Sequence, residues 1–206
     1  SPLLSNDDVI LTCLQQAGIA QVDALHYGTS ACWEPLLIGK DSSQNNTSIL
    51  NFLVPIVKLM NDDLLTREEV YQRYFSYLKE EILRICQASK ALVYEKDAFL
   101  TLCIDGCWQS VKDVAEGGAC YHNTGITTVA MGNAINALFN IEELVYKKKL
   151  FTLAQLQMYL EDAEHGEQFR YFLQQKGVFG DDEQKTMISR INQITAYAAQ
   201  VFAEEK

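Results

Sequence analysis

A capping signal followed by a long helical repeat constrains the fold of this chain most. In Thr66-Arg67-Glu68-Glu69, the threonine hydroxyl and the last glutamate can each accept a backbone N–H from the other residue. From there to about Ser89, apolar residues recur at helical spacing and charged residues occupy the remaining positions. The apolar set is Val70, Tyr74, Phe75, Leu78, Ile82, Ile85 and Cys86. This pattern predicts the longest helix of the chain, with a scaffolding role.

The rest of the chain also reads mainly as helix. Short apolar runs within 91–107 indicate one buried strand, and Pro55 implies a kink or a late start in the second predicted helix. No internal repeat or linker is visible, so 1–206 is predicted to be a single domain of helix-rich α/β class with two or three strands at most. The other predicted helices are 5–18, 47–60, 131–148, 152–163, a short one ending at Gly177, and 181–203.

Composition narrows the function classes. The 206 residues are 48% hydrophobic, and their net charge of −10 argues against nonspecific nucleic-acid binding, which needs a basic surface. The sequence shows neither an 18-residue apolar run nor a basic-then-apolar leader, so no membrane span or signal peptide is expected. The six cysteines include no Cys-x-x-Cys pair and indicate a reduced, cytoplasmic protein. Cys103 and Cys107 could share a helix face as metal ligands, but without nearby histidines core packing is favoured and no metal is predicted.

Cys32-Trp33-Glu34-Pro35 is the candidate for chemistry. Proline disfavours the α region at Glu34, and in an extended segment residues two apart point to one side, about 6.6 Å apart. The thiol and the carboxylate would then face one cavity, where one makes or breaks a bond and the other moves a proton. A buried cysteine beside a solvated glutamate is the alternative that spacing alone leaves open.

Two polar stretches add candidate substrate-binding residues. The first is the run of eight polar residues at 40–47, in which Asn45 and Asn46 could bind substrate hydroxyls or form a solvated turn. The second is the glycine-bracketed segment 119–124, in which Tyr121 and Asn123 are candidates. His122 lies between them, but a lone histidine is more often structural than catalytic.

Three blocks in order resemble one enzyme family. The first block runs from Pro2-Leu3-Leu4 and Asn6-Asp7-Asp8 to Cys32-Trp33-Glu34-Pro35. The second runs from Phe99-Leu100 and Asp105-Gly106-Cys107 through Gly117-Gly118-Ala119 to Asn123-Thr124-Gly125. The third ends in Phe179-Gly180-Asp181-Asp182. Together they are similar to glycyl radical enzymes, a pyruvate formate-lyase-like family, and to its diol- and glycerol-dehydratase-like branch in particular.

This resemblance implies a fold, an activity and partners. The fold would be part of a ten-stranded α/β barrel with the cysteine on an inner finger loop. Cys32 would be the thiyl radical that abstracts hydrogen from a small diol or amino alcohol, and Glu34 the acid/base for C–O or C–N cleavage. No cofactor is expected to be bound. A protein glycyl radical, installed by an S-adenosylmethionine-dependent activating enzyme, would start the reaction. The other partners implied are the remainder of the polypeptide or a complementary chain, and a second copy in a homodimer.

The sequence also departs from the family pattern. An Arg-Val-x-Gly-Tyr-like radical loop is not found in 1–206, so a central-to-C-terminal fragment, inactive by itself, is expected. Trp33 replaces the small aliphatic residue usual at that position and leaves the substrate open. Two alternatives remain: a glycyl radical decarboxylase or C–C lyase, and a non-catalytic helical module derived from the family.

Overall fold

The computed structural model describes residues 6–30, 34–62, 66–161 and 184–205. These residues form two compact units. Unit 1 comprises 1–47 and 92–126, and unit 2 comprises 48–91 and 127–206. Among the described residues, no helix combines the length and the apolar character that crossing a bilayer requires.

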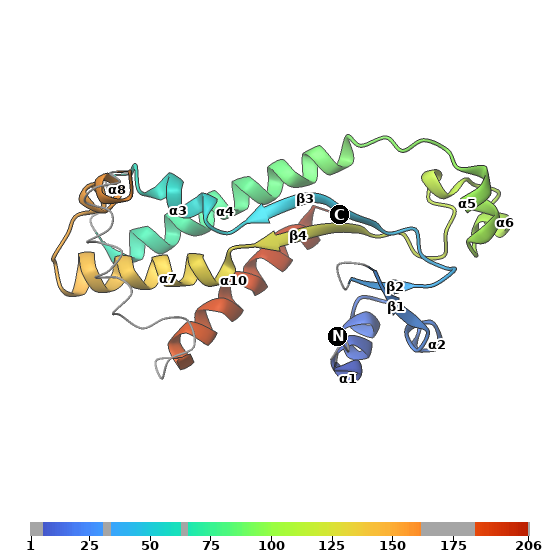
Figure 1. Cartoon of the computed structure of the whole chain (residues 1–206), viewed down its shortest axis with the longest axis horizontal. Coiled ribbons are helices and arrows are strands. Elements are labelled where there is room, and N and C mark those ends of the chain that lie inside the picture. The colour runs from blue at the N-terminus through green and yellow to red at the C-terminus, as the bar shows by residue number, and fades with distance from the viewer. Residues whose placement is uncertain (1–5, 31–33, 63–65, 162–183, 206) are drawn as a thin grey trace. The chain divides into compact units, whose positions relative to one another are not determined.

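Unit 2 is built on helix α4, Arg67–Lys90, the long helix predicted from the sequence. The predicted capping box is confirmed: Thr66 Oγ1 accepts the Glu69 N–H at 3.2 Å, and Glu69 Oε2 accepts the Thr66 N–H at 2.9 Å. One face of α4 packs against helix α3, Val54–Leu59, and against α10, Gln184–Glu204 (Figure 1). The side chains of α4 that this packing buries are Val70, Tyr74, Leu78, Ile82 and Ile85.

The remaining helices of unit 2 follow the sequence prediction with one change. Helix α7, Met131–Ile141, continues into a π-helical segment η2, Glu142–Lys147, where one helix was predicted over 131–148. Helix α8, Leu153–Glu161, lies within the predicted range 152–163 and is capped by Thr152, whose Oγ1 accepts the Gln155 N–H at 3.2 Å. The predicted short helix ending at Gly177 lies outside the described residues.

Unit 1 consists of short elements. Helix α1, Asp7–Gln16, lies within the predicted range 5–18 and is capped by Asn6, and α2, Gln21–Ala24, follows it. Strands β1, Tyr27–Thr29, and β2, Pro35–Leu37, form an antiparallel hairpin in which Tyr27 pairs with Leu37. Further along the chain lie α5, Ala98–Cys103, α6, Cys107–Ser110, and the 3₁₀ turn η1, Val114–Glu116.

Strands β3, Gln44–Asn51, and β4, Thr124–Val129, form a second two-stranded sheet. The Gln44 N–H bonds to the Asn123 carbonyl at 2.9 Å, and the Phe52 N–H bonds to the Val129 carbonyl at 3.2 Å. Both strands therefore advance in the same direction, as their arrowheads in Figure 1 do. The chain passes from one unit to the other within each of these strands and again between Ala91 and Leu92, after α4.

Three secondary-structure predictions are wrong. The described residues form four strands, where two or three at most were predicted. Residues 44–51 form a strand rather than a turn followed by a helix, and α3 begins only at Val54 with Pro55 in its first turn. The strand forms because β4, far along the chain, supplies its hydrogen-bonding partner. Residues 91–107 are not a buried strand: Asp97 Oδ1 accepts the Leu100 N–H at 2.9 Å and starts helix α5.

Candidate functional site

The hairpin β1–β2 carries the candidate acid/base at its end. The Ser30 N–H donates to the Glu34 carbonyl at 3.0 Å, and the Ser30 hydroxyl donates to the Glu34 carboxylate. Glu34 is half-buried and directly precedes β2. Cys32 lies outside the described residues, so its orientation toward the Glu34 side stays a prediction.

A polar cluster connects the segment before β1 with the segment after β2. Lys40 Nζ lies 2.6 Å from Asp23 Oδ1, and the Tyr121 hydroxyl donates to Asp23 Oδ2 at 2.7 Å. The Tyr121 hydroxyl in turn accepts the Ala20 N–H at 3.3 Å. Asp23 lies in α2 ahead of β1, Lys40 follows β2, and Tyr121 comes from the glycine-bracketed segment. These three side chains are called the Asp23 cluster below.

The charges of the cluster support each other. The hydrogen bond from Lys40, reinforced by that from Tyr121, holds the pKa of Asp23 below its ordinary value. The same bonds raise the pKa of Lys40 and of the Tyr121 hydroxyl above their ordinary values. At neutral pH the cluster therefore contains a carboxylate, an ammonium and a protonated phenol, which is the combination that its hydrogen bonds require.

The structure places the predicted substrate-binding residues on two neighbouring segments. Asn46 is exposed and lies in β3 with a positive φ of 57°. Asn45 lies in the same strand, and its side chain is outside the described part of the structure. Asn123 is exposed, and its carbonyl is bonded to the start of β3. Tyr121 uses its hydroxyl within the Asp23 cluster. The substrate-binding roles of all four residues stay predictions.

Sequence reasoning missed Asp23 and Lys40 as interacting groups. Their carboxylate and ammonium are 17 residues apart in the chain, and Tyr121 is 98 residues from Asp23. No local spacing rule links positions so distant, because folding alone brings them together. The useful signal was weak: a lysine directly after the hairpin and a tyrosine among glycines.

Unit 2 contains a different charged cluster, around Glu142. This carboxylate is 4% exposed, accepts a hydrogen bond from Arg190, and lies 3.3 Å from the Tyr71 hydroxyl, 3.4 Å from Arg67 Nε and 3.3 Å from Lys147 Nζ. Burial raises the pKa of Tyr71 to about 12. Because four donors surround one buried carboxylate that joins η2 to α4 and α10, the arrangement is that of a structural ion-pair network.

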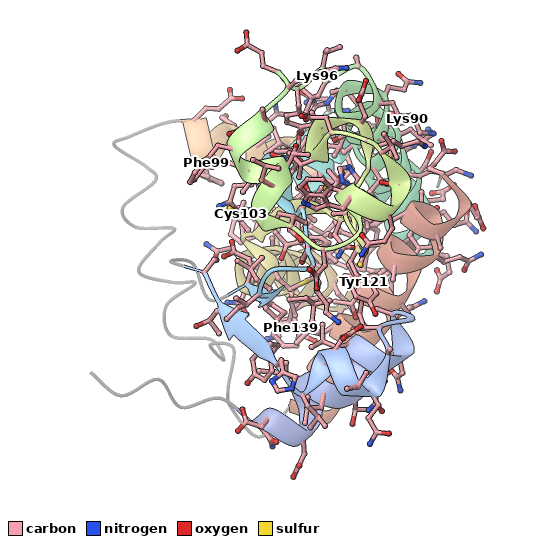
Figure 2. All side chains as sticks on the ribbon, turned by 90° about the vertical axis from the view of Figure 1, so that its right-hand side faces the viewer. Lys90, Lys96, Phe99, Cys103, Tyr121 and Phe139 are labelled. Carbon is pink, nitrogen blue, oxygen red and sulfur yellow. The ribbon has the colours of Figure 1, made fainter. Side chains whose placement is uncertain are left out.

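The described cysteines do not form a metal centre. Cys107 is buried, whereas Cys103 is exposed, so the prediction that both pack in the core is wrong for Cys103 (Figure 2). The helix α5 that carries Cys103 buries none of its residues, which explains the difference. Among the residues that the structure describes, no three His, Cys, Asp or Glu side chains are grouped as metal ligands would be.

Comparisons with known proteins decide the family. The sequence model described as "PFL-like: Pyruvate formate lyase-like" matches residues 1–205. This chain belongs to the pyruvate formate-lyase-like family. The resemblance to glycyl radical enzymes seen in the sequence is thereby confirmed.

Solved structures of family members show the same fold over the whole chain. The glycerol-bound form of the B12-independent glycerol dehydratase from Clostridium butyricum has a TM-score of 0.82 at 22% identity, over 100% of this chain and 28% of that one. A structure from work on 1,2-propanediol dehydration in Roseburia inulinivorans has a TM-score of 0.80 at 20% sequence identity. The match covers 97% of this chain and 28% of that one. A glycyl radical enzyme from Archaeoglobus fulgidus has a TM-score of 0.71 at 19% sequence identity. The match covers 97% of this chain and 28% of that one.

These likenesses confirm the predicted fold class, helix-rich and part of the glycyl radical enzyme barrel. They also show that the chain spans little more than a quarter of the length of each structure that it matches.

Proposed function

We propose that this chain is the finger-loop segment of a glycyl radical dehydratase that cleaves a C–O or C–N bond of a small diol or amino alcohol. Dehydratases among the structural neighbours support the reaction class. The observation that carries the proposal for this chain is the hairpin end, where the Ser30 hydroxyl and N–H hold Glu34 two residues from Cys32.

The two side chains divide the reaction. The Cys32 thiyl takes a hydrogen atom from a substrate carbon, which leaves a thiol and a carbon radical. Glu34 donates a proton to the neighbouring hydroxyl or amino group as its bond to carbon breaks, and water or ammonia leaves. The proton of the hydroxyl that remains on the radical carbon passes back to Glu34, which restores the carboxylic acid and leaves a neutral product radical. The thiol then returns the hydrogen atom to the product radical, so the cysteine is regenerated. The unpaired electron comes from a protein glycyl radical, made by the S-adenosylmethionine-dependent activating enzyme on another segment.

The hydrogen bond from Ser30 fits this role of Glu34. A hydroxyl can donate to a carboxylate or accept from a carboxylic acid, so the Ser30 hydroxyl can direct Glu34 both before and after it gives up its proton. The backbone bond between the same residues fixes the base of the glutamate side chain as well. A proton donor must lie within hydrogen-bond reach of its target, and this arrangement limits where Glu34 can point.

The proposal includes partners outside the chain. Unit 1 exposes large apolar side chains, among them Phe99 at 80% and Trp108 at 68%, as surfaces that pack against further protein do (Figure 2). We assign this surface to the remainder of the same polypeptide or a complementary chain, with the whole enzyme a cytoplasmic homodimer. The 206-residue chain incubated with the activating enzyme and S-adenosylmethionine should then give no glycyl doublet in electron paramagnetic resonance.

The decisive experiment changes the pair in the polypeptide that contains this chain. Cys32→Ser should abolish turnover, because an O–H bond is too strong to relay hydrogen atoms. Cys13→Ser changes an exposed cysteine of α1 and should leave turnover intact. Glu34→Gln should still exchange deuterium between labelled substrate and enzyme, while elimination slows by about 10²–10⁴-fold.

Each outcome separates the candidate functions. Full activity of Glu34→Gln would remove the carboxylate from the mechanism. A product formed by loss of carbon dioxide or by C–C cleavage would replace the dehydratase with the decarboxylase or lyase. Turnover that survives Cys32→Ser would remove Cys32 from the mechanism, whereas no turnover in the whole activated polypeptide would favour the non-catalytic module.

A further inference from the structure

The Asp23 cluster holds both ends of the segment that carries the candidate pair. Asp23 lies in α2, shortly before β1, and Lys40 lies three residues after the end of β2. Their 2.6 Å contact closes the stem of the hairpin, opposite the end where Ser30 and Glu34 meet. The hydrogen bonds of β1 and β2 lie between these two closures.

Tyr121 fixes this closure to the rest of unit 1. Its N–H donates to the Lys40 carbonyl at 3.0 Å, and its own carbonyl accepts the Ser42 N–H at 3.0 Å. Two further backbone bonds support the same junction, since the Asp105 N–H donates to the Gly39 carbonyl at 2.7 Å and the Cys120 N–H donates to the Asp105 carbonyl at 3.0 Å. The Tyr121 phenol therefore reaches Asp23 from a segment whose backbone is itself hydrogen-bonded to the residues that follow β2.

Burial makes the geometry of the cluster specific. The Asp23 side chain is 14% exposed, and both of its oxygens are occupied, one by Lys40 and one by Tyr121. Tyr121 also packs against the small core of Ile19, Ala24 and Leu37. A largely buried carboxylate is costly unless its partners stay in place, so each partner limits the movement of the others.

We propose that Asp23, Lys40 and Tyr121 are positioning residues that fix the β1–β2 hairpin so that Glu34 meets substrate in one orientation. The catalytic consequence rests on the proposed function, whereas the effect on the hairpin does not. The Ser30–Glu34 contact alone cannot fix this orientation, because it moves with the hairpin whenever the stem opens.

The first test measures the hairpin itself. Hydrogen exchange of the 27–37 backbone amides is compared between the unmodified polypeptide and Asp23→Asn, which keeps the size of the side chain and removes its charge. Protection of these amides should fall on the order of tenfold, while protection of α4 is unchanged. The rate of Cys32 alkylation by iodoacetamide, followed by mass spectrometry, should change in the same variant.

A matched control is available in the same unit. Lys96 Nζ lies 2.6 Å from Glu116 Oε1, the same distance as in the Asp23 pair, and Figure 2 shows Lys96 well apart from Tyr121. Lys96→Met should leave hairpin protection and Cys32 alkylation unchanged. If Lys96→Met loosens the hairpin as much as Asp23→Asn does, general destabilisation of unit 1 explains the result and the proposal is wrong.

The second test measures whether the three side chains stabilise the hairpin cooperatively. Tyr121→Phe removes a single oxygen, preserves the packing, and should lower kcat about three- to tenfold with KM for the substrate nearly constant. Asp23→Asn with Lys40→Met should lose no more hairpin protection than Asp23→Asn alone. Additive losses, or a Tyr121→Phe variant with unchanged kcat and unchanged hairpin protection, would overturn the proposal.

The two tests also separate this proposal from the proposed function. If Cys32→Ser keeps full turnover, the radical mechanism fails, and hairpin exchange in Asp23→Asn still decides the positioning role. If Cys32→Ser is inactive and hairpin exchange in Asp23→Asn is unchanged, the mechanism stands and the positioning role fails.

Discussion

The two units of this chain are stabilised in different ways. In unit 2, α3 and α10 pack against α4, and α7 packs against α3 and α10, and all four helices bury aliphatic side chains, as helices with one apolar face do. Among the described residues of unit 1, the buried apolar side chains are few: Ile19, Ala24, Leu37, Cys107 and Val114.

Unit 1 depends on close backbone contacts and polar closures instead. An ideal Cβ built at Gly118 would lie 2.3 Å from the Lys112 carbonyl oxygen, and one at Gly106 would lie 2.6 Å from the Cys120 nitrogen. Chain segments approach each other there more closely than side chains allow. The comparison indicates that a large core supports unit 2, the scaffold, while unit 1, which carries the candidate site, is sensitive to local geometry and to what covers it.

The largest expected effect is the loss of stability when a cavity is made in the core of unit 2. Leu78 of α4 is fully buried, so Leu78→Ala should lower the free energy of unfolding by about 3–5 kcal/mol, through lost burial and the cavity left behind. Leu102→Ala makes the same change at a position of unit 1 that is 60% exposed, and should alter stability by no more than about 0.5 kcal/mol. Urea unfolding followed by circular dichroism measures both. Equal losses would show that the two units do not differ in this way.

The second effect compares a buried with an exposed carboxylate. Glu142→Gln keeps the shape of the side chain but weakens its bonds to Arg190 and Tyr71, and should cost about 1.5–3 kcal/mol. Glu116→Gln weakens the exposed pair with Lys96 in unit 1 and should cost at most about 1 kcal/mol. The same urea titration applies. A larger loss in Glu116→Gln would mean that exposed ion pairs stabilise unit 1 more than buried charge stabilises unit 2.

The same division explains what the sequence could predict. Helix α4 was predicted with nearly its observed bounds, because its periodicity and its capping box lie within the segment itself. Strand β3 was missed because β4, its pairing partner, comes from a distant part of the chain. At 91–107, apolar composition suggested burial, but Phe99 and Leu102 are exposed and the local cap at Asp97 determines the structure.

The candidate site shows the same difference between local sequence signals and contacts that only folding creates. Cys32 and Glu34 could be proposed from a short motif and a family resemblance, and the extended approach to Pro35 follows from local sterics. The Asp23 cluster could not, because its members lie far apart in sequence and none belongs to a recognisable spacing. Non-local polar contacts are set by the packed fold, and a single sequence contains no direct record of them.

The third effect tests the close backbone contacts of unit 1. Gly118→Ala places a methyl group against the Lys112 carbonyl and should cost about 1–3 kcal/mol, confined to unit 1, as overpacking does. Gly132→Ala in α7 meets open space and should stabilise unit 2 slightly, since alanine is the better helix former. Hydrogen exchange resolved by segment measures both changes. Loss of protection in α4 of the Gly118→Ala variant would contradict the independence of the units.

The smallest effect compares two helix caps. Thr66→Ala removes the hydroxyl that accepts the Glu69 N–H and should lower the stability of unit 2 by about 1 kcal/mol, because α4 is part of its core. Asn6→Ala removes the equivalent acceptor of the Val9 N–H in unit 1. Helix α1 contains no buried residue, so losing this cap should fray its first turn without lowering the midpoint of global unfolding. Exchange of the α1 amides should therefore speed up in Asn6→Ala, while the urea midpoint shifts only in Thr66→Ala. A shared shift of the midpoint would show that α1 unfolds together with the core of unit 2, and that the contrast between the units does not extend to their cooperativity.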